Sequence, residues 1–204
     1  MKVCVATVRG REHARLGKNN QDAVAGCTEN GATAVVVADG CSEGAFSEVG
    51  SRLIARFVSQ RACSASPEET VDALVAWLRC FSLGPQFVQE QLLSTFLCAV
   101  ARDSEVTVFG IGDGVVFVDG ALRVLEAGPD NAPPYVAYRL LDMEAPLVVH
   151  HRGPAKRVAI GTDGAQGLEL ESCFGWTNEH ALQRRLNLTA GLHDDCTLAL
   201  LELA

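Results

Sequence analysis

Five acidic residues at the edges of predicted strands offer the ligands for a metal ion. Asp39, Asp113 and Asp163 each follow a largely apolar run and precede a glycine, whereas Asp22 and Asp194 stand apart. Hard cations such as Mg²⁺ and Mn²⁺ prefer carboxylate, carbonyl and water ligands. Two such ions about 3.5–4 Å apart can activate a water molecule for attack on phosphorus. These residue types therefore favour a binding site for hard divalent cations, of the kind that can support phosphate chemistry.

An Asp-Gly pair is also a common turn, so each aspartate taken alone is more simply a turn or cap residue. Three strand tips of one construction weaken that explanation, because their apolar preludes would place the carboxylates at one end of a sandwich. Asp39 is the clearest case. The run Val35 to Ala38 is typical of a buried strand, and Gly40 lets the backbone turn away at once. We therefore interpret the carboxylates jointly, as one site.

The elements that would position these residues are many strands, with two consecutive helices after the third strand. Helices are predicted over 48–63 with Ser47 as N-cap, from Ser66-Pro67 to near Gly84, and over 179–186. Segments 9–21 and 128–146 are predicted to be irregular, and 86–92 is ambiguous. Strands are predicted over 2–8, 22–27, 32–39, 93–101, 105–111, 115–118, 122–125, 147–150, 157–160 and 197–203. This order favours an α+β layered sandwich.

Length and composition predict a single globular domain over 1–204. The 204 residues are 48% hydrophobic and 21% charged, which is ordinary for a protein with one sizeable core. The formal charge of −8 argues against a nucleic acid or an anionic membrane as partner, because those need clustered Lys and Arg. Eight scattered cysteines without a C-x-x-C pair suit a reducing compartment, and no leader is apparent. We therefore expect a cytoplasmic protein.

The aspartates belong to five short motifs that resemble those of the metal-dependent PP2C or PPM family of protein phosphatases. The motifs are Asn20-Gln21-Asp22-Ala23, Val37-Ala38-Asp39-Gly40, Gly112-Asp113-Gly114, Thr162-Asp163-Gly164 and Asp194-Asp195-Cys196-Thr197. The stretch from Asp39 to Gly50 is similar to a compact bacterial branch in particular. Each motif alone is weak, but the five stand in the family's order and near its spacing. The resemblance runs from about Val8 to the C-terminus.

The resemblance implies a four-layer α/β/β/α sandwich, in which two antiparallel sheets are flanked by helices and hold two Mn²⁺ or Mg²⁺ ions at one end. It implies hydrolysis of phosphoserine and phosphothreonine in proteins by direct attack of metal-bound water. By position, Asp39 would bridge the two metals and the Gly40 carbonyl would be a ligand. Asp163 and Asp194 would complete one metal. With Asp39, they are the residues that we expect to be catalytic.

Three further aspartates receive roles from the same resemblance. Asp22 would act on the metals mainly through water. Asp113 matches the position associated with a third, weaker metal. Asp195 stands where many relatives have Asn, and it would support the metal ligands by hydrogen bonding.

The chain departs from the family pattern at two places that matter for catalysis. Gly17 stands where many relatives have an Arg that holds the substrate phosphate. Some relatives have a His directly after the Asp-Gly pair that protonates the leaving group, whereas this chain has Cys41-Ser42. Solvent, a metal-bound water or His13 would then supply that proton. The candidates for the missing phosphate ligand are the nearby basic residues Arg11, His13, Arg15 and Lys18.

These departures keep a rival hypothesis open, namely a pseudophosphatase that binds a phosphoprotein or another partner without turnover. The complete set of aspartates opposes it, because buried carboxylates that face one another without a use are costly. The segment between Gly164 and Asp194 is short, so a large substrate-contacting flap is not expected. The main hypothesis remains a phosphatase that acts, as a monomer, on phosphoserine and phosphothreonine proteins.

Overall fold

Two five-stranded antiparallel sheets form the centre of the molecule. The computed structural model describes residues 1–81, 84–128, 132–176, 178–189 and 191–203. One sheet has the strand order β1-β10-β9-β6-β7 and the other the order β2-β3-β4-β5-β8. The strands are β1 (Lys2–Val8), β2 (Ala23–Glu29), β3 (Ala32–Gly40), β4 (Ser94–Arg102), β5 (Glu105–Ile111), β6 (Gly114–Val118), β7 (Ala121–Leu125), β8 (Val148–Pro154), β9 (Arg157–Gly161) and β10 (Cys196–Glu202).

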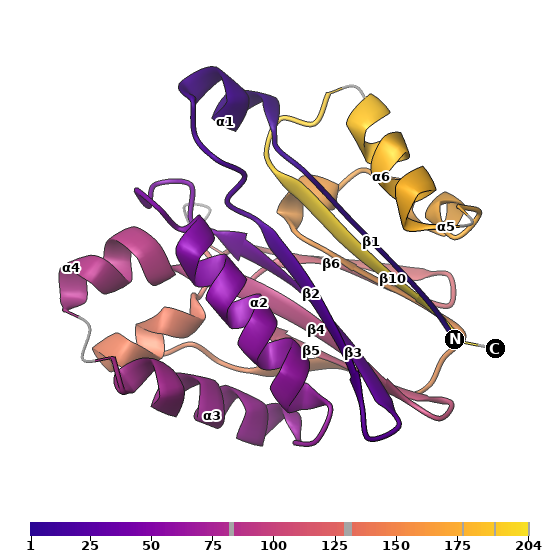
Figure 1. Cartoon of the computed structure of the whole chain (residues 1–204), viewed down its shortest axis with the longest axis horizontal. Coiled ribbons are helices and arrows are strands. Elements are labelled where there is room, and N and C mark those ends of the chain that lie inside the picture. The colour runs from indigo at the N-terminus through magenta and orange to yellow at the C-terminus, as the bar shows by residue number, and fades with distance from the viewer. Residues whose placement is uncertain (82–83, 129–131, 177, 190, 204) are drawn as a thin grey trace.

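Helices cover the outer face of each sheet (Figure 1). α2 (Glu48–Ala62) packs on β2 and β3, with α3 (Pro67–Arg79) beside it, and α6 (Glu179–Leu188) packs on β1. α5 (Leu170–Cys173) joins α6 over the first sheet, where both contribute buried side chains to one core cluster. This arrangement confirms the predicted α+β sandwich of two antiparallel sheets flanked by helices.

The middle of strand β3 is apolar without interruption because both of its faces are buried. Val35 and Val37 face the other sheet and enter the core between the sheets. Val36 and Ala38 face α2 and enter the core beneath the helices. Because successive side chains point to opposite faces and both faces are buried here, the segment from Ala34 to Ala38 is apolar at every position. Each buried valine contributes about 1.5–3 kcal/mol, and together they fix the strand that carries Asp39.

The prediction that segment 9–21 is irregular is wrong in part, because α1 (Arg11–Leu16) forms within it. The helix is too short to show an apolar period, and no side chain caps its start. An ion pair from Arg15 to Glu12 and the burial of His13 stabilise it instead. Gly17 ends it in the left-handed conformation, with φ of 70°, which glycine adopts at little cost.

Other boundaries also differ from prediction where local contacts replace sequence pattern. The ambiguous segment 86–92 is α4 (Pro85–Phe87) followed by a π-helical turn, η1 (Val88–Leu92). Within 128–146, η3 (Val136–Leu141) forms a 3₁₀ helix, and positions 129–131 lie outside the described residues. α3 ends at Arg79, before the predicted stop. Ser47 precedes α2 but its hydroxyl makes no capping bond, and α5 was not predicted.

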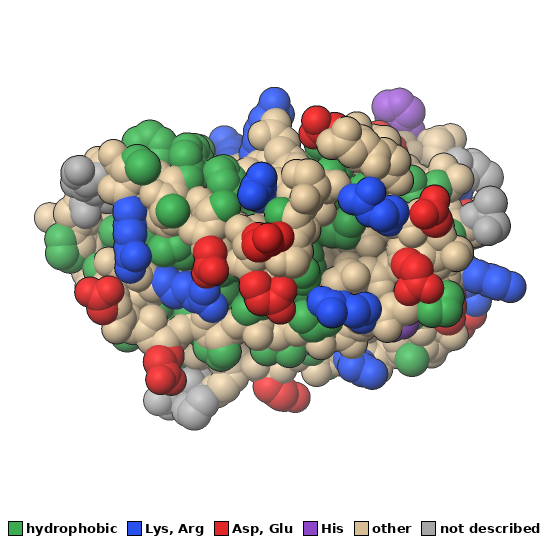
Figure 2. Space-filling model, turned by 90° about the horizontal axis from the view of Figure 1, so that it is seen from below, with side chains coloured by type: hydrophobic (Ala, Val, Ile, Leu, Met, Phe, Trp, Pro, Cys, Tyr) green, Lys and Arg blue, Asp and Glu red, His purple; other side chains and the backbone are tan. Residues whose placement is uncertain are grey.

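None of the helices within the described residues combines the length and hydropathy needed to cross a bilayer. The face seen in Figure 2 has acidic and basic side chains interspersed over its surface. It therefore lacks, on that side, the continuous basic stripe that nucleic-acid binding requires.

Ser66 makes the predicted cap at the start of α3, and we expect its loss to destabilise the protein. Its side chain accepts from Glu69 N at 3.2 Å, while Glu69 accepts from Ser66 N at 2.9 Å. Replacing such a cap costs about 1 kcal/mol, which lowers Tm by roughly 2–4 °C in a protein of this size. Calorimetry on Ser66→Ala should show this shift, whereas Ser64→Ala, outside the capping box, should leave Tm nearly unchanged. Equal Tm values for the two variants would contradict the assignment.

Candidate metal centre and phosphate cleft

The structure brings the five strand-end aspartates together at one end of the sandwich. Asp39 lies at the end of β3, Asp22 directly before β2 and Asp194 just before β10. Asp113 sits between β5 and β6, and Asp163 follows β9. Both sheets therefore contribute. Asp39, Asp113, Asp163 and Asp194 line one cleft of about 480 Å³.

Strand register explains this convergence. In the pairing of β6 with β9, Val115 lies opposite Gly161. Because the strands are antiparallel, Asp113 and Asp163 leave the sheet at the same edge, two residues beyond that pair. In the other sheet Ala23 lies opposite Ala38, so Asp22 and Asp39 are likewise neighbours across a strand pair.

A threonine holds the Asp22 carboxylate in place, but one oxygen of Asp22 and one of Asp163 have no hydrogen-bond partner among the described residues. Thr162 donates from Oγ1 to Asp22 Oδ2 at 2.8 Å, and the Thr197 backbone N–H donates to Thr162 Oγ1 at 3.0 Å. Asp39 and Asp163 lie close enough for the charge of Asp163 to raise the pKa of Asp39. Asp22 Oδ1 and Asp163 Oδ1 are buried and have no hydrogen-bond partner among the residues that the structure describes. Buried polar atoms are normally satisfied, so these oxygens suit a cation as their missing partner.

The burial of the carboxylates makes their ionisation unfavourable. Burial raises the pKa of Asp39 well above its usual value, and the neighbouring charges of Asp22 and Asp163 raise it further. Burial also raises the pKa of Asp22 to about 8 and that of Asp113 to about 6. Like charges held together in a low dielectric favour the protonated form. A divalent cation would reverse this balance, and an all-oxygen donor set fits Mg²⁺ or Mn²⁺.

Two glycines allow the ligand-bearing loops to pack without a gap. A Cβ built on Gly164, beside Asp163, would lie 1.9 Å from the Asp195 carbonyl oxygen. A Cβ on Gly10 would lie 2.2 Å from the Asp194 carbonyl carbon. Both distances are far below contact, so any side chain there would push apart the loops that carry Asp163 and Asp194. The glycine of the Thr162-Asp163-Gly164 motif is therefore required by packing.

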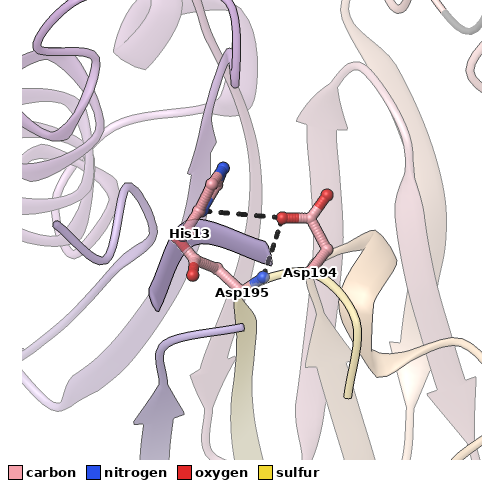
Figure 3. Close-up of side chains that lie close together, drawn as sticks. All are labelled: His13, Asp194 and Asp195. Carbon is pink, nitrogen blue, oxygen red and sulfur yellow. Dashed lines mark hydrogen bonds and ion pairs between the residues drawn. The ribbon is translucent and has the colours of Figure 1, made fainter. Parts of the chain in front are cut away.

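Asp195 ties three segments together behind the cleft. It is 2% exposed and accepts hydrogen bonds from Gly10 N at 2.7 Å and Gln21 N at 2.6 Å. His13 Nδ1 lies 2.8 Å from its Oδ2. Figure 3 shows His13 and Asp195 side by side, with Asp194 adjacent. Asp195 thus positions the loops that hold Asp22 and Asp194.

The four basic candidates for the phosphate lie outside the lining of the cleft. His13 is buried beside Asp195, Arg11 is exposed, and Arg15 is bonded to Glu12. Lys18 contacts the edge of the cleft, because its Nζ donates a hydrogen bond to the carbonyl oxygen of Ser42, which lines the cleft. Within the described residues no Lys, Arg or His lines the cleft.

The opposite wall of the cleft was not anticipated from the sequence. Tyr135 and Tyr138 line it, with Leu93 and Pro133. The two rings meet edge to face at 5.4 Å. Burial raises the pKa of the Tyr135 phenol, and the adjacent Cys41 thiol raises it further, so the phenol stays neutral. The chain's two tyrosines both fall in the proline-rich stretch 128–146, and this clustering was the available signal.

Comparisons with known proteins identify a family that the sequence matches and solved structures that share the fold. The model of the protein phosphatase 2C family matches residues 9–190, and no curated protein matches significantly. The serine/threonine phosphatase Stp1 from Staphylococcus aureus aligns over 100% of this chain and 95% of its own, with a TM-score of 0.69 and 13% identity.

Two further solved structures share the fold. PppA, a regulatory component of the type VI secretion system in Pseudomonas aeruginosa, aligns over 99% of this chain and 97% of its own, with a TM-score of 0.65 and 20% identity. The catalytic domain of the serine/threonine phosphatase PstP, in complex with two manganese ions, aligns over 98% and 96%, with a TM-score of 0.62 and 17% identity.

These structural likenesses, at such low identity, establish the fold, whereas the family model establishes descent. It spans the segment from α1 through α6 and includes four of the five aspartates that the sequence singled out. The predicted family and enzyme class are thereby confirmed. The chain belongs to the protein phosphatase 2C family, whose members are protein-serine/threonine phosphatases.

Proposed function

We propose that the protein hydrolyses phosphoserine and phosphothreonine in proteins with the help of bound Mn²⁺ or Mg²⁺. The observation that carries the proposal is the gathering of buried and half-buried carboxylates at the cleft, where oxygens of Asp22 and Asp163 have no hydrogen-bond partner among the described residues. Buried like charges persist in a fold when they coordinate a metal. The manganese ions of PstP, which shares the fold, support a metal centre here.

The ligand set follows from family position and from the cleft. By family position, Asp39 would be shared between two ions and the Gly40 carbonyl would be a further ligand. Asp163 and Asp194 would complete the ligands of one ion. When bound, the ions lower the pKa of a water molecule and neutralise charge on the phosphoryl oxygens.

The outer positions support these ligands. Asp22 would act on the ions through water, and Asp113 would hold a third, weaker ion. Asp195, held by two backbone N–H groups, orients the loops of Asp22 and Asp194. His13 keeps Asp195 in place from behind.

The remaining cleft residues bind the phosphorylated segment. The Tyr135 and Tyr138 rings offer an apolar wall for the substrate chain. Lys18, anchored on Ser42 at the edge, supplies the nearest positive charge to the phosphate. Because no imidazole lines the described cleft, solvent provides the proton for the departing serine or threonine oxygen.

One observation favours the alternative of a pseudophosphatase. The described cleft lining lacks a cationic side chain, and transition-state charge is commonly stabilised by such groups. Saturable Mn²⁺ and phosphopeptide binding without any turnover would support that alternative.

Asp39→Asn should abolish activity and yet stabilise the metal-free protein. Hydrolysis of para-nitrophenyl phosphate with Mn²⁺ should fall about 100-fold or more, because the bridging charge is lost. Burial and like charge raise the pKa of Asp39, so its ionisation in the unfolded chain favours unfolding at pH 8. Asn cannot ionise, and the metal-free variant should therefore have a higher Tm at pH 8. Asp163→Asn should behave alike. Asp103→Asn, in an exposed turn, is the control. Undiminished activity in the Asp39 variant would refute the ligand assignment.

Lys18→Ala should weaken the handling of the phosphate. A charged hydrogen bond is worth about 1.5–3 kcal/mol, so kcat/KM should drop roughly tenfold or more while Mn²⁺ affinity stays the same. Lys156→Ala is the matched control, since Lys156 is exposed and precedes β9, at the end of that strand away from Asp163. If Lys18→Ala and Lys156→Ala had the same kcat/KM, the phosphate contact would have to come from another residue, with Arg11 the next to test.

A further inference from the structure

A second concavity lies on the outer surface of the helices, away from the carboxylates. It is an open groove of about 500 Å³ between α2 and Trp77 of α3, here called the α2 groove. Its apolar floor is made by Val49, Leu53 and Phe57, together with Trp77. Arg52 and Arg56 border it.

The floor of the α2 groove is an ordered aromatic surface. Phe57 and Trp77 stack with ring centroids 4.9 Å apart and planes 22° apart. Phe81 meets Trp77 edge to face at 5.1 Å. Phe57 and Trp77 pack on the core beneath the helices, while Leu53 is 37% and Phe81 53% exposed. Rigid, half-exposed aromatic rings are typical anchors of protein interfaces.

The charges around the groove are of one sign. Arg52 and Arg56 are one helical turn apart and exposed, and within the described residues neither makes an ion pair or a side-chain hydrogen bond. No acidic residue lines the groove. This local excess of positive charge stands out in a chain of net charge −8.

Three surface arginines elsewhere in the described chain are engaged by neighbouring side chains. Arg139 pairs with Asp72 at 3.6 Å, and Arg157 pairs with Glu171 at 3.0 Å. Arg185, beside the chain's other tryptophan, stacks over the Trp176 ring at 5.8 Å. Arg52 and Arg56 lack such partners among the described residues, so their guanidinium groups are free to bind a partner protein.

We propose that the α2 groove binds an acidic segment of a partner protein that carries a large apolar anchor. The anchor packs on Trp77 and Phe57, and carboxylates of the segment pair with Arg52 and Arg56, whose guanidinium groups bind carboxylates in bidentate fashion. Two arginines on an acidic protein are too few for a nucleic acid. The groove is also too open to enclose a small anion, so an extended peptide is the fitting occupant.

The test is binding of synthetic peptides to the full chain, followed by fluorescence anisotropy. The probe is a labelled peptide in which leucine and phenylalanine are flanked by glutamates. Saturable binding should weaken tenfold or more in the double variant Arg52→Glu/Arg56→Glu, and also as salt is raised. A peptide with lysine in place of glutamate should show the reverse preference. Arg184→Glu, on α6, is the matched control and should bind like the unaltered chain.

Several outcomes would overturn the proposal. They are a lack of saturable binding by the acidic peptide, equal affinity in the Arg52→Glu/Arg56→Glu variant, and an equal loss in Arg184→Glu, which would reveal a general charge effect. All the variants alter exposed side chains, so we expect them to fold like the unaltered chain, and circular dichroism checks this. Since binding is measured without metal, its result is independent of whether the carboxylate centre catalyses hydrolysis.

Discussion

The mutual repulsion of buried carboxylates is the constraint on which the rest of the structure depends. Asp22 and Asp39 are neighbours at the end of one sheet, and Asp163 approaches Asp39 from the other sheet. Burial and proximity raise their pKa values, so these carboxyl groups favour their protonated forms when no cation balances their charge. Such a group is stable only on a scaffold with large hydrophobic stabilisation elsewhere. A divalent cation turns the same geometry into a favourable one.

The scaffold meets this demand through a strand buried on both faces and loops packed behind the ligands. β3 places valines in the core between the sheets and in the core beneath α2, so Asp39 cannot retreat from its neighbours. Asp195 binds the backbone of Gly10 and Gln21, and Gly164 lies against its carbonyl oxygen. These contacts act on the positions of the ligands and leave the cleft open to a phosphorylated chain.

The sheets and the carboxylate positions could be predicted because they follow from local patterns. Apolar runs that end in Asp-Gly identify strand tips, and antiparallel pairing then brings them to one edge. The residues around the cleft could not be predicted in the same way. α1 is too short to show a helical period, and the burial of His13 depends on Asp195, far away in the chain. Of the two tyrosines that line the cleft, Tyr138 lies in η3 and Tyr135 directly precedes it, in a stretch without periodicity. Long-range contacts, and not local propensity, decide these positions.

The central claim is that the carboxylates form a metal centre, and anomalous diffraction from crystals soaked in Mn²⁺ tests it most directly. The account predicts manganese peaks enclosed by Asp39, Asp163 and Asp194, with the Gly40 carbonyl as a ligand, and no peak at these positions in crystals of Asp39→Asn. Crystals that stay free of manganese at the cleft, or that hold it only beside His13 and Asp195, would contradict the account.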